Sequence, residues 1–170
     1  RSIPGCTANV MSLCAIYTVN GTVLTAGTNG SGVYYSPNAG VTWTKIERLG
    51  LKNQTCWTLY YPSAYFEGEL SLFVGTNGKG IFKTNWNGTE FGNIWVSTFR
   101  RTNAISGYAP SMTRFGNYYY IASVGCPGYP GVYRTDLNFT NAVPVYLQYP
   151  VETVITQGSN LFAGASNNSA

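Results

Sequence analysis

Histidine is absent from this sequence of 170 residues, and Lys, Arg, Asp and Glu together make up only 9% of it. Without histidine, a Ser-His-Asp triad or a Cys-His pair is excluded as a catalytic group. The charged fraction is also far below the roughly 25% of an ordinary soluble domain. The surface must therefore consist largely of Asn, Thr, Ser, Gly and Tyr. This composition predicts an extracellular protein, either secreted or on a cell surface.

Long apolar runs and clustered positive charges are missing as well. The sequence holds no run of 18 apolar residues, so no membrane span is predicted. It begins at Arg1 without Met or a recognisable leader, which suggests a processed or excised piece. The net charge of +4 comes from scattered residues, of which only Arg100 and Arg101 are adjacent basic neighbours. Because a nucleic-acid surface needs several cations on one face, we expect no nucleic-acid partner.

Cysteine is sparse but even in number: Cys6, Cys14, Cys56 and Cys126. No Cys-x-x-Cys pair occurs, and with no histidine either, neither a metal site nor another cofactor is predicted. In an extracellular protein the four cysteines predict two disulfides, for which three pairings are open. We favour a local Cys6–Cys14 bridge and a long-range Cys56–Cys126 bridge. Buried free thiols in a reducing compartment are the alternative.

Six Asn-x-Ser/Thr sequons are candidates for glycosylation. They lie at Asn20, Asn29, Asn53, Asn87, Asn138 and Asn167. This is more than chance alone predicts from the content of Asn, Ser and Thr. An occupied sequon carries a bulky sugar, so each one predicts an exposed loop in a secreted protein.

An internal repeat dominates the sequence. Residues 23–36 (VLTAGTNGSGVYYS) align without a gap to residues 71–84 (SLFVGTNGKGIFKT), 48 positions later. A third copy keeps the spacing of 48 up to Ser123, and a partial fourth begins at Asn160. The Asn-Gly pair favours the positive φ angles of a tight hairpin. Since Lys79 in the second copy is replaced by Ser31 in the first, the segment predicts a hairpin and not a phosphate-binding loop.

Further strands flank each hairpin, giving four antiparallel strands per repeat. This period predicts an all-β fold, a β-propeller of four-stranded antiparallel blades, because the nearly continuous apolar strands need cover on both faces. The predicted blades span about 14–51, 56–104 and 109–150, with a partial blade at 151–170, after an N-terminal segment 1–13. All belong to a single domain, 1–170. About three and a half blades leave a ring open, so the chain is a fragment of a larger propeller, or its ring is closed by strand exchange or dimerisation.

The segment Ser36–Trp43 (SPNAGVTW) matches a known repeat pattern at Ser36, Gly40 and Trp43, with Asn38 where Asp is usual. It resembles the Asp-box of neuraminidase-type (BNR) repeats, which occur in sialidase-like and sortilin-like propellers. The second copy keeps a degenerate box at Thr84, Gly88 and Phe91. The resemblance implies a structural turn. A short Asx side chain accepts backbone N–H groups there, and glycine takes a positive φ.

Residues for catalysis are few. A glycosidase needs acid and base carboxylates on either side of the bond. Glu67 and Glu69 lie close together in a loop, but a solvated hairpin tip is the simpler interpretation. The sequence shows no convincing trio of arginines of the kind that grips a carboxylate in sialidases. No catalytic residue is therefore predicted.

Aromatic side chains at predicted strand ends or in loops offer contacts for sugars or protein partners. They are Trp57, Tyr60, Tyr61, Trp86 and Tyr129. Packing between blades is the alternative for each of them.

The sequence thus favours a non-catalytic extracellular β-propeller module that interacts with a protein or glycan or builds a surface assembly. The alternative is a part of a secreted glycoside hydrolase, sialidase-like or glucanase-like, as the resemblance allows. A homo-oligomer or an additional propeller segment would complete the ring.

Overall fold

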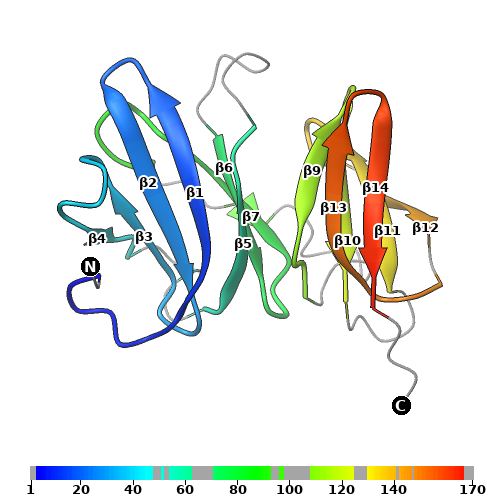
Figure 1. Cartoon of the computed structure of the whole chain (residues 1–170), viewed down its shortest axis with the longest axis horizontal. Coiled ribbons are helices and arrows are strands. Elements are labelled where there is room, and N and C mark those ends of the chain that lie inside the picture. Colours follow the sequence, from blue (N-terminus) through cyan, green and yellow to red (C-terminus); the bar gives the residue numbers. More distant parts are fainter. Residues whose placement is uncertain are drawn as a thin grey trace. The chain divides into compact units, whose positions relative to one another are not determined.

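The structure is a computed structural model that describes residues 3–47, 51, 54–62, 71–92, 96–97, 108–124, 130–140, 142–146 and 148–166. Within these residues the chain forms strands β1 to β14 and no helix (Figure 1). The strands make three four-stranded sheets and one two-stranded sheet. The prediction of an all-β fold built from small antiparallel sheets is confirmed.

The sheets follow one another along the chain. The first contains β1 (Val10–Thr18), β2 (Gly21–Thr28), β3 (Val33–Ser36) and β4 (Thr44–Lys45). The second contains β5 (Cys56–Tyr60), β6 (Ser71–Thr76), β7 (Ile81–Asn85) and β8 (Val96–Ser97). The third contains β9 (Met112–Phe115), β10 (Tyr118–Ser123), β11 (Gly131–Asp136) and β12 (Ala142–Tyr146), and the last contains β13 (Val151–Gln157) and β14 (Asn160–Ala165). In each sheet, neighbouring strands are also neighbours in the sequence, so every sheet is a simple meander.

The repeated Thr-Asn-Gly-x-Gly segments form the same turn in the first two sheets. The backbone N–H and the Oγ1 hydroxyl of Thr28 both donate to the carbonyl oxygen of Gly32, at 3.0 and 2.6 Å. The N–H and hydroxyl of Thr76 donate in the same way to Gly80, at 3.0 and 2.8 Å. Gly32 and Gly80 have φ angles of +81° and +77°, which a side chain would oppose. Lys79 is exposed, and the glycines of this segment shape a hairpin.

The contacts divide the chain into two compact units. Unit 1 consists of Arg1–Val74 and Phe82–Val96, and unit 2 consists of Gly75–Ile81 and Ser97–Ala170. Each unit has its own apolar core.

In unit 1, one face of the first sheet packs on the second sheet. Buried side chains from both sheets form this core, among them Ile16, Val23, Val33, Leu59, Leu72 and Val74. Gly27 in β2 lies at a close approach between the sheets. A Cβ atom built there would be 2.6 Å from Ser12 Oγ and 2.8 Å from the carbonyl oxygen of Cys56. The packing of β2 on β5 therefore requires glycine at this position.

In unit 2, β13 lies against β9 and β10. The core here is formed by Ala122 and Val132 of the third sheet and Val151 and Val154 of β13. Ser111 Oγ donates to the carbonyl oxygen of Val154 at 3.2 Å and accepts its N–H at 3.1 Å. The last sheet is therefore attached to the third by apolar packing and by hydrogen bonds.

The third copy of the repeat is shifted by one residue from its expected position. Gly27 pairs with Val33 in the first sheet, and Ala122 pairs with Val132 in the third. The equivalent residues Gly27 and Ala122 are 122 − 27 = 95 positions apart, whereas two steps of 48 predict Ser123. A shift of one residue exchanges the two faces of a strand. The spacing of 48 is thus wrong by one residue in the third copy, and Ala122 contributes to the core of unit 2.

Candidate functional site

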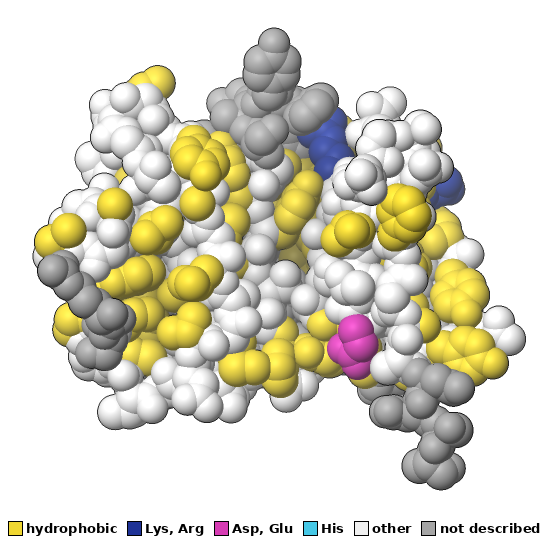
Figure 2. Space-filling view, viewed as in Figure 1, with side chains coloured by type: hydrophobic (Ala, Val, Ile, Leu, Met, Phe, Trp, Pro, Cys, Tyr) yellow, Lys and Arg dark blue, Asp and Glu magenta, His cyan; other side chains and the backbone are white. Residues whose placement is uncertain are grey.

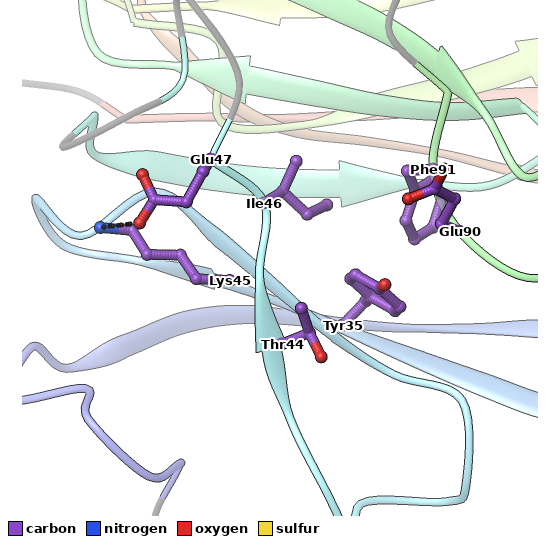
Figure 3. Close-up of a pocket in the computed structure, with 7 residues that line it drawn as sticks. All are labelled: Tyr35, Thr44, Lys45, Ile46, Glu47, Glu90 and Phe91. Atoms are coloured by element: carbon purple, nitrogen blue, oxygen red, sulfur yellow. Dashed lines mark ion pairs between the residues drawn. The ribbon is translucent and has the colours of Figure 1, made fainter.

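An open pocket of about 210 Å³ lies in unit 1 (Figure 3). Its walls come from β3, from β4 with the two residues after it, and from the turn that follows β7. The lining residues are Tyr35, Thr44, Lys45, Ile46, Glu47, Glu90 and Phe91. Two successive repeats therefore build the pocket together.

The floor of the pocket is apolar and aromatic. Ile46 and Phe91 are buried. The Tyr35 ring stands edge-on to the Phe91 ring, with centroids 5.5 Å apart, and to the Trp86 ring, at 5.6 Å. Trp86 and Phe91 are themselves 5.0 Å apart. Because the three rings support one another, Tyr35 is held in one orientation at the pocket.

The rim of the pocket is polar. Thr44, Glu47 and Glu90 are exposed. Lys45 Nζ lies 3.7 Å from Glu47 Oε1, and this ion pair occupies one end of the pocket in Figure 3, while Glu90 lies at the other end beside the Phe91 ring. A hydroxyl, an ammonium and carboxylates thus surround an aromatic floor. This arrangement suits a ligand with both hydrogen-bonding groups and an apolar face.

The carboxylates of the pocket lie in solvent. The Glu47 side chain is 55% exposed and pairs with Lys45, and Glu90 is exposed as well. A catalytic acid of a glycosidase is usually held protonated by an apolar enclosure. The surroundings of Glu47 and Glu90 therefore suit binding better than acid catalysis. Glu67 and Glu69, the acidic pair noted in the sequence, lie outside the described residues.

Side chains hold together the turn from Ser36 to Trp43. Ser36 Oγ accepts the N–H of Gly40 at 2.8 Å, and Asn38 Oδ1 accepts the N–H of Thr42 at 2.8 Å. Asn38 Nδ2 also donates to Thr42 Oγ1 at 2.9 Å. Gly40 has a φ of +87°, and Trp43 packs on the outer face of the first sheet. Asn38 forms these bonds without the negative charge of the usual aspartate.

The second turn of this kind contains the degenerate box Thr84, Gly88 and Phe91. Thr84 Oγ1 donates to the carbonyl oxygen of Gly92 at 3.2 Å, and Gly88 has a φ of +105°. Trp86 stands where the box has its Asx residue, but Asn87 takes over the acceptor role. Its Oδ1 accepts the N–H of Glu90 at 2.9 Å. Sequence alignment missed Asn87 because it lies one position later than the box predicts.

Asp136 holds the third turn. Its Oδ1 accepts the N–H groups of Asn138 and Thr140, both at 3.0 Å, and its Oδ2 accepts the Thr140 hydroxyl. These bonds lower the pKa of the Asp136 carboxyl, and the bond from the Thr140 hydroxyl contributes most. Phe139 in the turn has a φ of +57°. An Asx acceptor therefore lies at the end of the third strand or just after it in all three complete sheets. It stands two positions after Ser36 in the first, three after Thr84 in the second and one after Thr135 in the third.

Replacing Asn38 or Asp136 with alanine should destabilise the protein with different pH dependences. We expect Asn38→Ala to reduce the free energy of unfolding by about 1 kcal/mol at every pH from 7 to 3, since its amide carries no charge. The lowered pKa of Asp136 means that its stabilisation is complete above the unfolded pKa and is lost as the pH falls through the folded pKa. The difference in the free energy of unfolding between wild type and Asp136→Ala should therefore shrink below about pH 4.

Urea unfolding curves of the two variants across this pH range measure both effects. If the loss of unfolding free energy in Asp136→Ala stays constant from pH 7 to pH 3, the charged carboxylate does not stabilise the third turn.

The aromatic residues predicted to face a ligand take different positions. Trp57 and Tyr60 are half-buried, and Tyr61 packs against the core of unit 1. Trp86 is only 6% exposed and is part of that core. It supports the floor of the pocket through Tyr35 and Phe91. The prediction that Trp86 faces a ligand is therefore wrong. Tyr129 lies outside the described residues.

The structure shows Cys6, Cys14 and Cys56 as free thiols, so neither favoured disulfide is present. Cys6 packs on one face of the first sheet, beside Tyr34, and Cys14 packs on the core at the other face. A Cys6–Cys14 bridge would have to cross the sheet. Burial raises the pKa of Cys14 to about 11 and that of Cys56 to about 12. Cys126 lies outside the described residues.

Four of the six sequon asparagines lie on the surface. Asn20, Asn29, Asn87 and Asn138 are exposed, while Asn53 and Asn167 lie outside the described residues. Within the described part of the chain, no cluster of His, Cys, Asp and Glu could hold a metal ion. No helix there has the length and apolar character to cross a membrane.

Comparisons with known proteins concern the fold. No protein-family model matches the chain, and no curated protein sequence does. The structure is similar to the computationally designed Ika4 protein, with a TM-score of 0.62 and 8% identity over 98% of this chain and 91% of that one. It is also similar to a chain in the crystal structure of BBS1N in complex with ARL6DN, with a TM-score of 0.61 and 12% identity over 94% of this chain. The match covers 49% of that second chain, so the sequence spans about half of its length.

Proposed function

We propose that the chain is part of an extracellular β-propeller, built from repeats of the neuraminidase type, that binds a protein or glycan ligand without converting it. Meander sheets of four antiparallel strands suit propeller blades. Face-to-face packing of successive sheets within each unit, as between β2 and β5, also supports this arrangement. The turn at Ser36, Asn38, Gly40 and Trp43 supports the family resemblance, because its side chains bond as an Asp-box requires.

The pocket at Tyr35 carries the functional part of the proposal. Its aromatic floor and its rim of Thr44, Lys45, Glu47 and Glu90 suit a saccharide, which has an apolar face and hydroxyl groups around its edge. The exposed carboxylates favour recognition over acid catalysis. The exposed sequons and the low charge of the chain support an extracellular location.

A glycan array combined with a turnover assay tests the proposal. We expect the 170-residue chain to bind a limited set of glycans and to leave sialosides and β-glucans intact. Glu90→Gln should weaken binding about fivefold or more, because an amide makes weaker hydrogen bonds to hydroxyl groups than a carboxylate does. Glu152→Gln is a matched control, since Glu152 is an exposed glutamate in unit 2.

Turnover of a sialoside or a β-glucan that Glu90→Gln abolishes would contradict the proposal and favour the glycoside hydrolase alternative. Equal binding by wild type and Glu90→Gln would show that the pocket is not the binding site.

A further inference from the structure

The hairpin β13–β14 is equivalent to the hairpin β1–β2. Both contain the same irregularity in strand pairing. Val10 pairs with Thr28 and Ser12 with Gly27, while Val151 pairs with Ala165 and Thr153 with Gly164. β14 is therefore a second strand like β2, β6 and β10.

Second strands of the complete sheets are paired on both edges. Residues 24–27 of β2 pair with residues 33–36 of β3, and residues 118–123 of β10 pair with residues 131–136 of β11. Among the described residues, β14 pairs only with β13. Its other edge, at about residues 161–164, carries backbone N–H and C=O groups without a neighbouring strand in the described part of the chain.

The exposure of β14 differs from that of its equivalents. Every residue of β6 is buried, and Thr25 and Ala26 of β2 are fully buried. In contrast, Phe162 of β14 is 49% exposed, and its partner across the hairpin, Ile155, is 56% exposed. Hydrophobic side chains lie over β13 and β14 in the space-filling view of Figure 2, and few charged side chains appear on this face.

The fourth strands of the first and third sheets carry features that discourage further pairing. β4 has only two residues, one of which is Lys45, and β12 has Pro144 in its middle. Short length, lysine and proline are common ways to block the edge of a sheet. The six residues of β14, NLFAGA, include neither a charge nor a proline. The edge of β14 therefore has the properties of an acceptor for another strand.

We propose that the edge of β14 binds an extended peptide strand of glycine followed by an aliphatic and an aromatic residue, in antiparallel orientation. This is the chemistry of the strands that occupy the equivalent edges in this chain, which read Gly-Val-Tyr or Gly-Ile-Phe from the glycine at or just before the start of the strand. In the first sheet, Tyr35 of the third strand lies opposite Thr25. Phe162 takes the place of Thr25 in β14, so the fourth residue of a Gly-Val-Tyr-Tyr strand, which corresponds to Tyr35, would lie opposite the Phe162 ring.

Binding of a labelled synthetic peptide to the 170-residue chain tests this proposal. The peptide has the sequence GVYYS of residues 32–36, which places Tyr35 opposite Phe162, with blocked ends, and binding is followed by fluorescence anisotropy and by backbone amide shifts. We expect saturable binding, with the largest shifts in residues 160–165. The same peptide N-methylated at alternate residues should bind about tenfold more weakly or not at all, because strand pairing needs its N–H groups.

Protein variants locate the binding site. Phe162→Lys should weaken binding about tenfold, since it removes the aromatic contact and adds a charge to the edge. Tyr17→Lys is the matched control, because Tyr17 is an exposed aromatic residue on β1, and it should leave binding unchanged.

Three results would overturn the proposal. The first is equal binding of the N-methylated peptide, and the second is a set of amide shifts outside β13 and β14. The third is dimerisation through β14 that excludes the peptide, detected by sedimentation, in which case a second copy of the chain is the occupant.

Discussion

Gly27→Ala should reduce the free energy of unfolding by about 2–3 kcal/mol, at the upper end of the usual cost of overpacking. The new methyl group would lie 2.8 Å from the carbonyl oxygen of Cys56, which is backbone and cannot rotate away. It would also lie 2.6 Å from Ser12 Oγ, which can. The strands β2 and β5 would have to separate, and part of the apolar core of unit 1 would lose contact.

Gly92→Ala is the control for this substitution. Its Cβ would meet the carbonyl oxygen of Asn85 at 3.5 Å, an ordinary contact, and Gly92 does not have a positive φ. Its effect should lie within about 0.5 kcal/mol of zero, because alanine also reduces the entropy of the unfolded chain. Urea unfolding followed by circular dichroism compares the two variants. Similar stabilities would show that β2 and β5 do not lie as close as described.

Trp86→Ala should reduce the free energy of unfolding by about 3–5 kcal/mol. The indole is 6% exposed, and its removal would leave a cavity in the core and break the edge-to-face contacts with Tyr35 and Phe91. Edge-to-face pairs add to the effect of burial. Because these rings form and support the floor of the pocket, any ligand of the pocket should bind more weakly to this variant as well.

Tyr17→Ala is a suitable comparison for Trp86→Ala, since the Tyr17 side chain is 71% exposed. It should change the stability by less than about 0.5 kcal/mol. The thermal unfolding midpoints of the two variants measure this difference in stability. Equal midpoints would contradict the assignment of Trp86 to the core.

The strands and hairpins were predictable from local sequence. Gly30 and Gly32 in the first hairpin, and Gly78 and Gly80 in the second, have positive φ angles that few other residues adopt. The same kind of local chemistry explains why the turn at Asn38 could be located. Its equivalents at Asn87 and Asp136 were missed because an Asx side chain reaches its N–H partners from several positions in a turn, so no fixed spacing marks it.

The pocket and the burial of the aromatic residues depend on contacts between repeats. Tyr35 and Phe91 meet only after two sheets have packed, and nothing in either local sequence indicates that contact. Trp86 is aromatic and flanked by Asn85 and Asn87 in the sequence, which is equally consistent with an exposed turn and with a core position. The one-residue shift at Ala122 has a similar origin, because strand register is set by pairing with the neighbouring strand.

The half-buried thiol of Cys14 and the buried thiol of Cys56 would react slowly if the folded chain met an oxidant. A thiol must lose its proton before it attacks a disulfide or a peroxide. With pKa values raised to about 11 and 12, Cys14 and Cys56 are almost entirely protonated near neutral pH once the sheets have formed. Folding thus makes both thiols less reactive. A chain that folds before it meets an oxidant should therefore keep these two thiols reduced for longer than a chain that meets the oxidant unfolded.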